Sequence, residues 1–421
     1  MPAIVPTFNV VFWGIVTFSL LVVLHEGGHF IAARLFRVKV HEFMIGLPGP
    51  AIRLKTKSTS YGITAIPLGG YVRIAGMEPG TEDPLLGPAL MVVTTRRRAT
   101  DANVAEALSL EPEHAEKLLI TLADWGAISA DPADKTAWVA EMTLNDAEDE
   151  QALLSRARSV TYRGRKTWQR ITMLAAGVFV NLLAAILTFT IVLSIYGYFV
   201  PSLVIDETTK GSPAREAGLR SGDRIVSIGS TQLKDWNGLI TTISAHKPGD
   251  QVRIIFVRNG RQQTATAKLE SVGGKPRLGI ASRIEHKYFS VPGAVVESLR
   301  WTGLVFVAVA DFFRPSTFVQ SVGQARSVIG ISQEVAKAVK QGPLDYAWLV
   351  AFLSLSLGCL NILPIPPLDG GKAAMELIER VMGHPMKREV YMAISATGAI
   401  LLFTLIAYLM YADVVRIVTN G

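Results

Sequence analysis

The sequence predicts a polytopic α-helical membrane protein that also carries folded units outside the bilayer. Hydrophobic residues make up 49% of the 421 residues, and the mean hydropathy is +0.33, which is more apolar than soluble globular proteins usually are. Four apolar runs are long enough to cross a bilayer as helices. They cover roughly residues 8–24, 171–200, 346–362 and 394–411, and the first continues as a helix to Phe36.

The first apolar run resembles a secretory signal peptide only in its position. No Lys or Arg precedes its apolar core, and His25 and Glu26 follow it where a signal peptide would have a small-residue cleavage site. A further segment, Trp301–Phe313, is short for a span and contains Asp311, which favours a helix at the membrane interface. The single cysteine, Cys359, lies in an apolar run and excludes an internal disulfide.

Basic residues flank the apolar runs and predict their orientation. They follow the first run, precede the second, and lie between the third and fourth, at Arg34, Arg37, Lys39, Arg163, Arg165, Lys166, Arg170, Lys372, Arg380, Lys387 and Arg388. Cytoplasmic flanks of membrane proteins are rich in Lys and Arg, which accounts for the net charge of +7 without a nucleic-acid partner. We therefore expect a multi-pass protein of the cell membrane, with both termini and residues 201–345 outside the cytoplasm and residues 84–158 in the cytosol.

Residues 46–83 have the pattern of a small membrane-associated β-hairpin or sheet. Three short stretches have strand character, namely Ala51–Lys55, Tyr61–Ile66 and Tyr71–Ala75. Glycine and proline turn residues separate them. We expect these strands to lie beside the first apolar run.

Residues 84–158 resemble a winged-helix domain in the order of their elements. Ala99–Ala107 and Pro112–Trp125 have helical patterns, and a strand, a turn and a second strand follow. The second helix carries Glu113 and Glu116 where DNA phosphates would approach, and an acidic surface repels phosphate. The composition therefore favours a module that contacts protein, such as a basic cytosolic peptide, over one that binds nucleic acid.

Residues 203–284 carry the glycine and proline turns of a PDZ domain. Gly211–Ala214 and Ala217–Asp223 resemble the turn and helix start of bacterial PDZ domains. Leu278, Gly279 and Ile280 match the loop that holds a peptide carboxylate, where consecutive backbone N–H groups lie beside an open strand edge. The alternative is that these three residues are an ordinary strand start.

The sequence His25-Glu26-Gly27-Gly28-His29 ends the first apolar run. Histidines at i and i+4 share one helix face, so both imidazoles reach one Zn²⁺ ion. Glu26 is placed to act as a general base for the attacking water. In a soluble helix the same pattern is more often a pair of satisfied histidines, but ionisable residues at membrane depth are costly and indicate function.

A third ligand is expected after the third apolar run, within the stretch Asn361–Gly371. Its prolines interrupt the helix and leave a carboxylate, Asp369, near membrane depth. Two histidines, one aspartate and an open position form a catalytic zinc site. The alternative is that Asp369 caps a helix over residues 370–381.

Together these motifs resemble the site-2 protease family of intramembrane zinc metalloproteases, in the bacterial branch with one PDZ domain. Besides the two metal-site motifs, the resemblance includes Pro67–Arg73 and Ala175-Ala176-Gly177 followed by Asn181. It extends over nearly the whole chain except residues 84–158. The chain departs from the family at Gly27, where a bulky residue is common, and at Val178, where proline is usual.

The resemblance implies a role for each matching residue. It implies that His25, His29 and Asp369 bind zinc, that Glu26 is the base, and that Asn361 assists at the substrate or transition state. It also implies that the hairpin presents an edge strand to the unwound substrate through Gly70, Tyr71, Val72 and Arg73. The expected substrates are single-span membrane proteins in the lipid bilayer, such as anti-sigma factors or signal-peptide remnants.

Two alternatives to an intramembrane zinc metalloendopeptidase are a membrane-embedded metal transporter and a non-catalytic scaffold. A transporter would have paired polar sites in two repeats, which the sequence lacks, and the complete set of four catalytic residues argues against a scaffold. The expected segments are residues 1–45 with the first zinc motif, 46–83 with the hairpin, 84–158 with the winged-helix-like module, 159–202 with the second span, 203–284 with the PDZ domain, 285–345 with an interfacial segment, and 346–421 with the last two spans.

Overall fold

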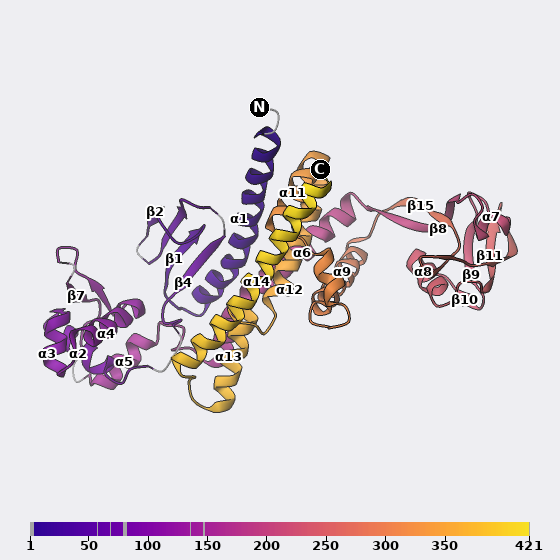
Figure 1. The fold of residues 1–421 in the computed structure, drawn as a ribbon. Coiled ribbons are helices and arrows are strands. Elements are labelled where there is room, and N and C mark those ends of the chain that lie inside the picture. The colour runs from indigo at the N-terminus through magenta and orange to yellow at the C-terminus, as the bar shows by residue number, and fades with distance from the viewer. Residues whose placement is uncertain are drawn as a thin grey trace. The chain divides into compact units, whose positions relative to one another are not determined.

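The computed structural model describes residues 4–56, 58–67, 69–78, 82–134, 136–145 and 148–420. The chain forms two compact units, which are described separately. The first comprises residues 1–189 and 295–421, and the second comprises Thr190–Ala294. Figure 1 shows the course of the chain through its helices and strands.

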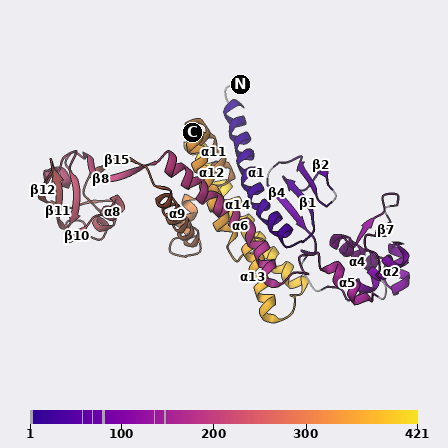
Figure 2. The ribbon, with the colours of Figure 1, turned by 180° about the vertical axis from the view of Figure 1, so that it is seen from behind.

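Within the described residues, five helices are long and apolar enough to cross a membrane. Four of them correspond to the four predicted spans, and both views place these four side by side (Figures 1 and 2). At most 33% of the residues in the apolar window of each helix are buried within the structure. The five are α1 (Ile4–Leu35), α6 (Thr167–Ile195), α9 (Val291–Asp311), α12 (Pro343–Asn361) and α14 (Arg388–Asn420).

Helix α9 is longer than the interfacial helix expected at Trp301–Phe313. It begins ten residues earlier, at Val291. Glu297 and Arg300 interrupt the apolar pattern of residues 291–300, so the sequence did not predict this part of the helix. Trp301 packs edge-on against Phe189 of α6 and Trp348 of α12, with ring centroids 5.2 and 4.6 Å apart. Helix α9 therefore lies against two of the predicted spans.

A four-stranded sheet follows α1 directly, in the order β2-β3-β1-β4. Three strands match the expectation, and β1 was missed because apolar and polar residues do not alternate in its sequence and it begins only four residues after α1. Strand β4 is an edge strand that pairs antiparallel with β1. The strands are β1 (Val40–Ile45), β2 (Ala51–Lys55), β3 (Ser60–Thr64) and β4 (Gly70–Ile74).

Residues 86–158 form a small module of helices around a three-stranded sheet with the order β5-β7-β6. The two predicted helices and the two later strands are present, and α2 and α5 were missed. The sequence of α2 contains a Gly-Pro pair and β-branched residues, which are poor helix formers. The elements are α2 (Leu86–Arg96), β5 (Arg98–Thr100), α3 (Asp101–Leu108), α4 (Pro112–Trp125), β6 (Ile128–Ala130), β7 (Ala137–Ala140) and α5 (Glu150–Arg158).

The second unit contains a sheet with the order β12-β11-β9-β8-β15, in which β15 is an edge strand. Helix α8 (Trp236–Ser244) contributes Leu239 to an apolar core that includes Ile225, Ile254 and Phe256. The strands are β8 (Tyr198–Thr208), β9 (Arg224–Ile228), β10 (Thr231–Gln232), β11 (Gln251–Arg258), β12 (Arg261–Lys268), β13 (Glu270–Val272), β14 (Lys275–Arg277) and β15 (Ile280–Lys287), with the short helix α7 (Pro213–Glu216).

The remaining helices of the first unit connect α9 to α12 and α12 to α14. Helix α11 (Val328–Gln341) packs against α1 and α12. Helix α10 (Phe318–Gln324) precedes it. Helix α13 (Asp369–Met382) follows the proline-rich stretch after α12 and begins at the aspartate of interest.

Candidate metal centre

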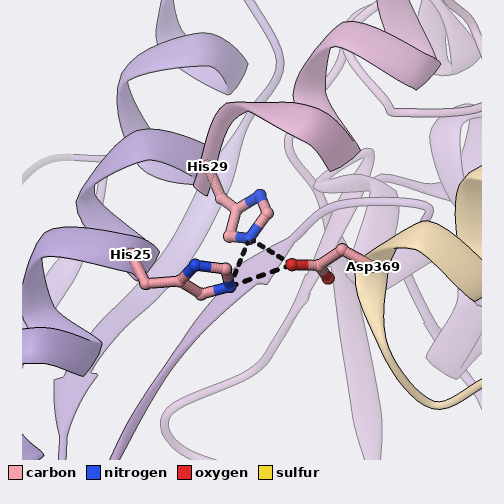
Figure 3. Close-up of side chains that lie close together, drawn as sticks. All are labelled: His25, His29 and Asp369. Atoms are coloured by element: carbon pink, nitrogen blue, oxygen red, sulfur yellow. Dashed lines mark hydrogen bonds and ion pairs between the residues drawn. The ribbon is translucent and has the colours of Figure 1, made fainter. Parts of the chain in front are cut away.

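His25 and His29 lie on successive turns of α1 and point toward one carboxylate, that of Asp369 (Figure 3). The Nε2 atoms of His25 and His29 are 2.9 and 3.1 Å from Asp369 Oδ2, and 3.3 Å from each other. All three residues are buried. The structure therefore brings together the three residues that the sequence predicted as metal ligands.

Asp369 reaches the histidines because the chain folds back sharply after α12. Leu368, rather than Asp369, occupies the N-cap position of α13, and Asp369 is the first residue of the helix. A side chain on Gly370 would collide with the carbonyl oxygen of Ile362, so the end of α12 and the start of α13 touch through their backbones. The alternative role of Asp369 as a helix cap is therefore wrong.

The three donor atoms fit a zinc ion. They lie within 4.8 Å of one another. Zinc–ligand bonds of about 2.0–2.1 Å place the donors of a tetrahedral site about 3.3 Å apart, close to the three separations in this structure. Two imidazoles and one carboxylate also leave one tetrahedral position open, as in catalytic zinc sites.

Helix α6 orients both imidazoles through their second nitrogens. His29 Nδ1 lies 2.8 Å from the carbonyl oxygen of Met173, so Nδ1 carries the proton and Nε2 offers its lone pair. His25 Nδ1 lies 3.3 Å from the amide of Asn181, which is fully buried. The Asn181 oxygen has no hydrogen-bond partner among the described residues. Turning this amide by 180° lets the oxygen accept from His25 Nδ1–H, which leaves His25 Nε2 free to bind metal.

Two glycines allow α6 to pack this closely on the histidine helix. A side chain on Gly28 would collide with the carbonyl oxygen of Ala176 and lie 2.8 Å from Gly177 Cα. A Cβ on Gly177 would lie 2.5 Å from His29 Nε2 and 2.8 Å from His25 Cε1. By contrast, a Cβ on Gly27 would meet nothing within 4 Å. Of the two glycines in the motif, only Gly28 is required by packing.

Two further charged groups belong to the site. Glu26 is partly buried on α1 and interacts electrostatically with both histidines and with Asp369. Lys372 lies one turn after Asp369 on α13, with Nζ 3.5 Å from Asp369 Oδ1. Asn361 is buried as the last residue of α12, next to the Ile362 carbonyl that faces Gly370.

The four residues predicted to contact substrate near the metal lie on β4, beside α1. A Cβ on Gly70 would lie 3.3 Å from Val22 Cγ1, one turn before His25. The Tyr71 hydroxyl donates to Glu42 Oε2 at 3.0 Å, and Arg73 Nη2 donates to Asp124 Oδ1 at 3.2 Å. Val72 pairs with Phe43 of β1. Leu68 of the same motif lies outside the described residues.

The other three predicted contact residues lie in the second unit. Leu278 is buried, Gly279 has a φ of +76° that glycine adopts readily, and Ile280 begins the edge strand β15. The Gly279 carbonyl accepts hydrogen bonds from Thr209 N at 2.9 Å and Ser212 Oγ at 3.1 Å. The loop is thus fixed at the start of an open strand edge.

Buried zinc-type ligands and a nearby glutamate, on a helix long and apolar enough to span a bilayer, define a membrane-embedded metallopeptidase. The model of peptidase family M50 matches residues 13–405. The chain belongs to this family, that of the site-2 proteases, and is a zinc metalloprotease and a multi-pass membrane protein.

Similar proteins extend over almost the whole chain. The zinc metalloprotease RasP of Geobacillus kaustophilus is 27% identical and matches 95% of this chain and 96% of its own length. RasP of Bacillus licheniformis is 26% identical, over 97% of this chain and 99% of its own. Among solved structures, the PDZ domain of an SdrC-like protein of Listeria monocytogenes is 26% identical, over 20% of this chain and 87% of its own, with a TM-score of 0.18.

Asn181 and Met173 are site residues whose roles the sequence did not reveal. Asn181 stood out only as part of the family motif, and its contact with His25 depends on how α6 packs on α1. Met173 contributes a backbone carbonyl, which no residue type encodes. The glycine at position 177, which permits the close contact, was the only local signal.

Proposed function

We propose that this zinc metalloprotease hydrolyses peptide bonds within the transmembrane segments of single-span membrane proteins. The observation that carries this proposal is the position of the metal centre. His25, His29 and Glu26 lie on α1, whose apolar part extends over Phe8–Leu35. Water-soluble chains do not reach such a site, whereas a helix that diffuses in the bilayer does.

In the proposed site, His25, His29 and Asp369 hold the zinc ion, and Glu26 acts as the general base. When bound, the metal polarises the scissile carbonyl and the attacking water. Glu26 takes the proton from this water and passes it to the leaving amine. Lys372, near the unshared oxygen of Asp369, offsets part of the negative charge in the site.

Edge strand β4 supports the next step, which is opening of the substrate helix. The peptide groups of a transmembrane helix bond to one another and are closed to attack. An extended segment that pairs with β4 at Gly70–Arg73 exchanges those bonds for hydrogen bonds to an edge strand. Asn361 completes the proposed substrate contacts with its side-chain amide.

The second unit is proposed to be a PDZ domain that selects substrates. Its loop at Leu278–Ile280 leads into the edge strand β15, an arrangement that can capture a chain terminus. By the distribution of basic residues, and with the four predicted spans crossing the bilayer, we propose that this unit and both termini lie outside the cytoplasm. Removing residues 203–284 tests the role, since it admits substrates with long ectodomains if the unit filters by size.

Residues 84–158 are proposed to be a cytosolic module of winged-helix type that contacts protein. The order α2-β5-α3-α4-β6-β7 supports the type. The matches to the two RasP proteins include most of these residues, so the expectation that the family resemblance excludes residues 84–158 was wrong. Acidic residues on α4 support a basic peptide as partner over nucleic acid.

The proposed activity is tested with the purified protein in lipid vesicles and a panel of tagged single-span substrates. Mass spectrometry of the products locates the cleaved bond. We expect cleavage inside the apolar segment, loss of cleavage with EDTA, and recovery when zinc is returned. Cleavage confined to extramembrane residues would contradict the proposal.

A further inference from the structure

One residue of the 86–158 module, Asp124, contacts the sheet beside the metal centre at three points. Asp124 lies in the last turn of α4. Its Oδ2 accepts from Gly76 N at 2.8 Å and its Oδ1 accepts from Arg73 Nη2 at 3.2 Å. Its backbone oxygen lies 2.5 Å from His41 Nε2. Three residues of the sheet region therefore contact a single residue of the module.

The contacted residues lie in or just after β1 and β4, the two strands that contact α1. Arg73 is in β4, Gly76 follows β4 directly, and His41 is in β1, the antiparallel partner of β4. Residues Gly70–Arg73, which are all of β4 except Ile74, are the proposed substrate edge. The clasp formed by Asp124, Arg73, Gly76 and His41 therefore fixes the C-terminal end of this edge, at Arg73.

The negative charge of Asp124 does not stabilise α4. A negative charge in the last turn opposes the helix dipole, so helix stability does not account for it. The Asp124 side chain is only 12% exposed, whereas Arg73 is 55% exposed. Buried carboxylates are retained where donors satisfy them, and here the donors come from the sheet.

The rest of α4 packs its buried face, including Leu118 and Leu122, into the core of the 86–158 module. A cavity of about 650 Å³ lies beside its exposed face, and its lining includes His114, Lys117 and Thr121 of α4 and, outside the module, Arg163 and Arg388. The end of α4 is thus the point where the helix touches β4, and a displacement of the module reaches the strand through Asp124.

We propose that Asp124 is a positioning residue for the substrate strand, through which the 86–158 module sets the placement of β4. The inference rests on the proposed function, because it takes β4 to be the strand that receives the substrate. A partner that binds the module changes substrate recognition by moving this clasp. The metal centre itself, on α1 and α13, is left in place.

The test uses the full-length protein in lipid vesicles, with Asp124→Ala, Asp124→Asn and the control Asp131→Ala. Asp131 pairs with Arg98 at 2.7 Å inside the same module and makes no contact with the sheet among the described contacts. Asp124→Asn keeps an acceptor for Gly76 N, so it restores part of what alanine loses.

The first measurement is amide hydrogen exchange over residues 70–76, because it does not depend on cleavage of a substrate. We expect exchange there to rise about tenfold in Asp124→Ala, less in Asp124→Asn, and not in Asp131→Ala, with zinc content unchanged. If residues 70–76 of Asp124→Ala exchanged at the wild-type rate, the inference would be overturned, whether or not the protein cleaves membrane substrates.

Cleavage kinetics are read second. We expect Asp124→Ala to raise KM about tenfold with kcat within twofold of wild type, and Asp124→Asn to fall between. A tenfold fall in kcat at constant KM, or no change in either parameter, would overturn the inference. Failure of the wild type to cleave any single-span substrate would instead remove the proposed function, while the exchange result would still decide whether Asp124 positions β4.

Discussion

His25 Nε2 and Asp369 Oδ2 lie 2.9 Å apart although 344 residues separate them in the chain. Such a contact joins the first and the last thirds of the sequence at one point inside the first unit. It requires the break between α12 and α13, because a continuous helix would carry Asp369 past the histidines. The metal centre is thus also a tertiary connection.

Removing Asp369 is expected to remove the metal. In Asp369→Ala, two imidazoles remain of the three protein ligands, so zinc content and cleavage should fall together. Metal analysis of the purified variant beside the wild type is the measurement. Undiminished zinc in the variant would rule out Asp369 as a ligand.

Asn181 is expected to tune zinc affinity without binding the metal. Partners that orient a ligating histidine typically contribute 10–100-fold in affinity, so Asn181→Ala should weaken zinc binding by about this factor. Asn181→Asp keeps an acceptor for His25 Nδ1–H and should bind zinc nearly as the wild type does. Competition with a fluorescent chelator measures both. Equal affinities in all three proteins would show that the contact at 3.3 Å has no orienting role.

The two glycines of the histidine motif are expected to respond differently to alanine. Gly28→Ala places a methyl group against Ala176 and Gly177 and should cost about 1–3 kcal/mol through overpacking. Gly27→Ala meets open space and should be neutral or stabilise α1 by up to about 1 kcal/mol. Thermal unfolding and zinc content of the two variants provide the comparison. Similar losses in both would mean that close packing of α6 is not the reason for Gly28.

The ion pair between buried Asp223 and partly exposed Arg258 is expected to make the second unit sensitive to acid. Asp223 Oδ1 and Oδ2 accept from Arg258 Nε and Nη2, both at 2.7 Å. Burial opposes ionisation, but the hydrogen bonds from Arg258 and from Arg220 N lower the pKa of Asp223 below its usual value. Arg258 is 25% exposed and can reach water when its partner is lost, so Asp223→Ala should lower the stability of this unit at neutral pH by about 1–3 kcal/mol, as expected for lost hydrogen bonds to a charged group.

The sign of the pH dependence follows from the lowered pKa. The stabilisation is present above the unfolded pKa of about 3.9 and declines as the pH falls through the lower folded pKa. Urea unfolding of this unit can be monitored by hydrogen exchange in the full-length protein at pH 7 and pH 3. The difference in free energy of unfolding between wild type and Asp223→Ala should be smaller at pH 3. An equal difference at both values would contradict the pairing.

The sequence predicted best the elements that have a strong local signal. The first helix, its histidine motif and the later break before Asp369 all follow from apolar length, i and i+4 spacing and proline, which act locally. Strand β1 and helix α2 were missed because their local patterns are weak and their partners in the fold stabilise them. The contact of Asp124 with Arg73 joins a module to a sheet, and no spacing in the sequence encodes it.

The central claim is that Glu26 activates water at a zinc ion held by other residues. Glu26→Gln keeps the size of the side chain and removes the base, and the three metal ligands are untouched. We predict that purified Glu26→Gln in lipid vesicles retains its zinc but cleaves a single-span substrate at least about 100-fold more slowly than the wild type. Cleavage at the wild-type rate by the zinc-loaded variant would contradict the account.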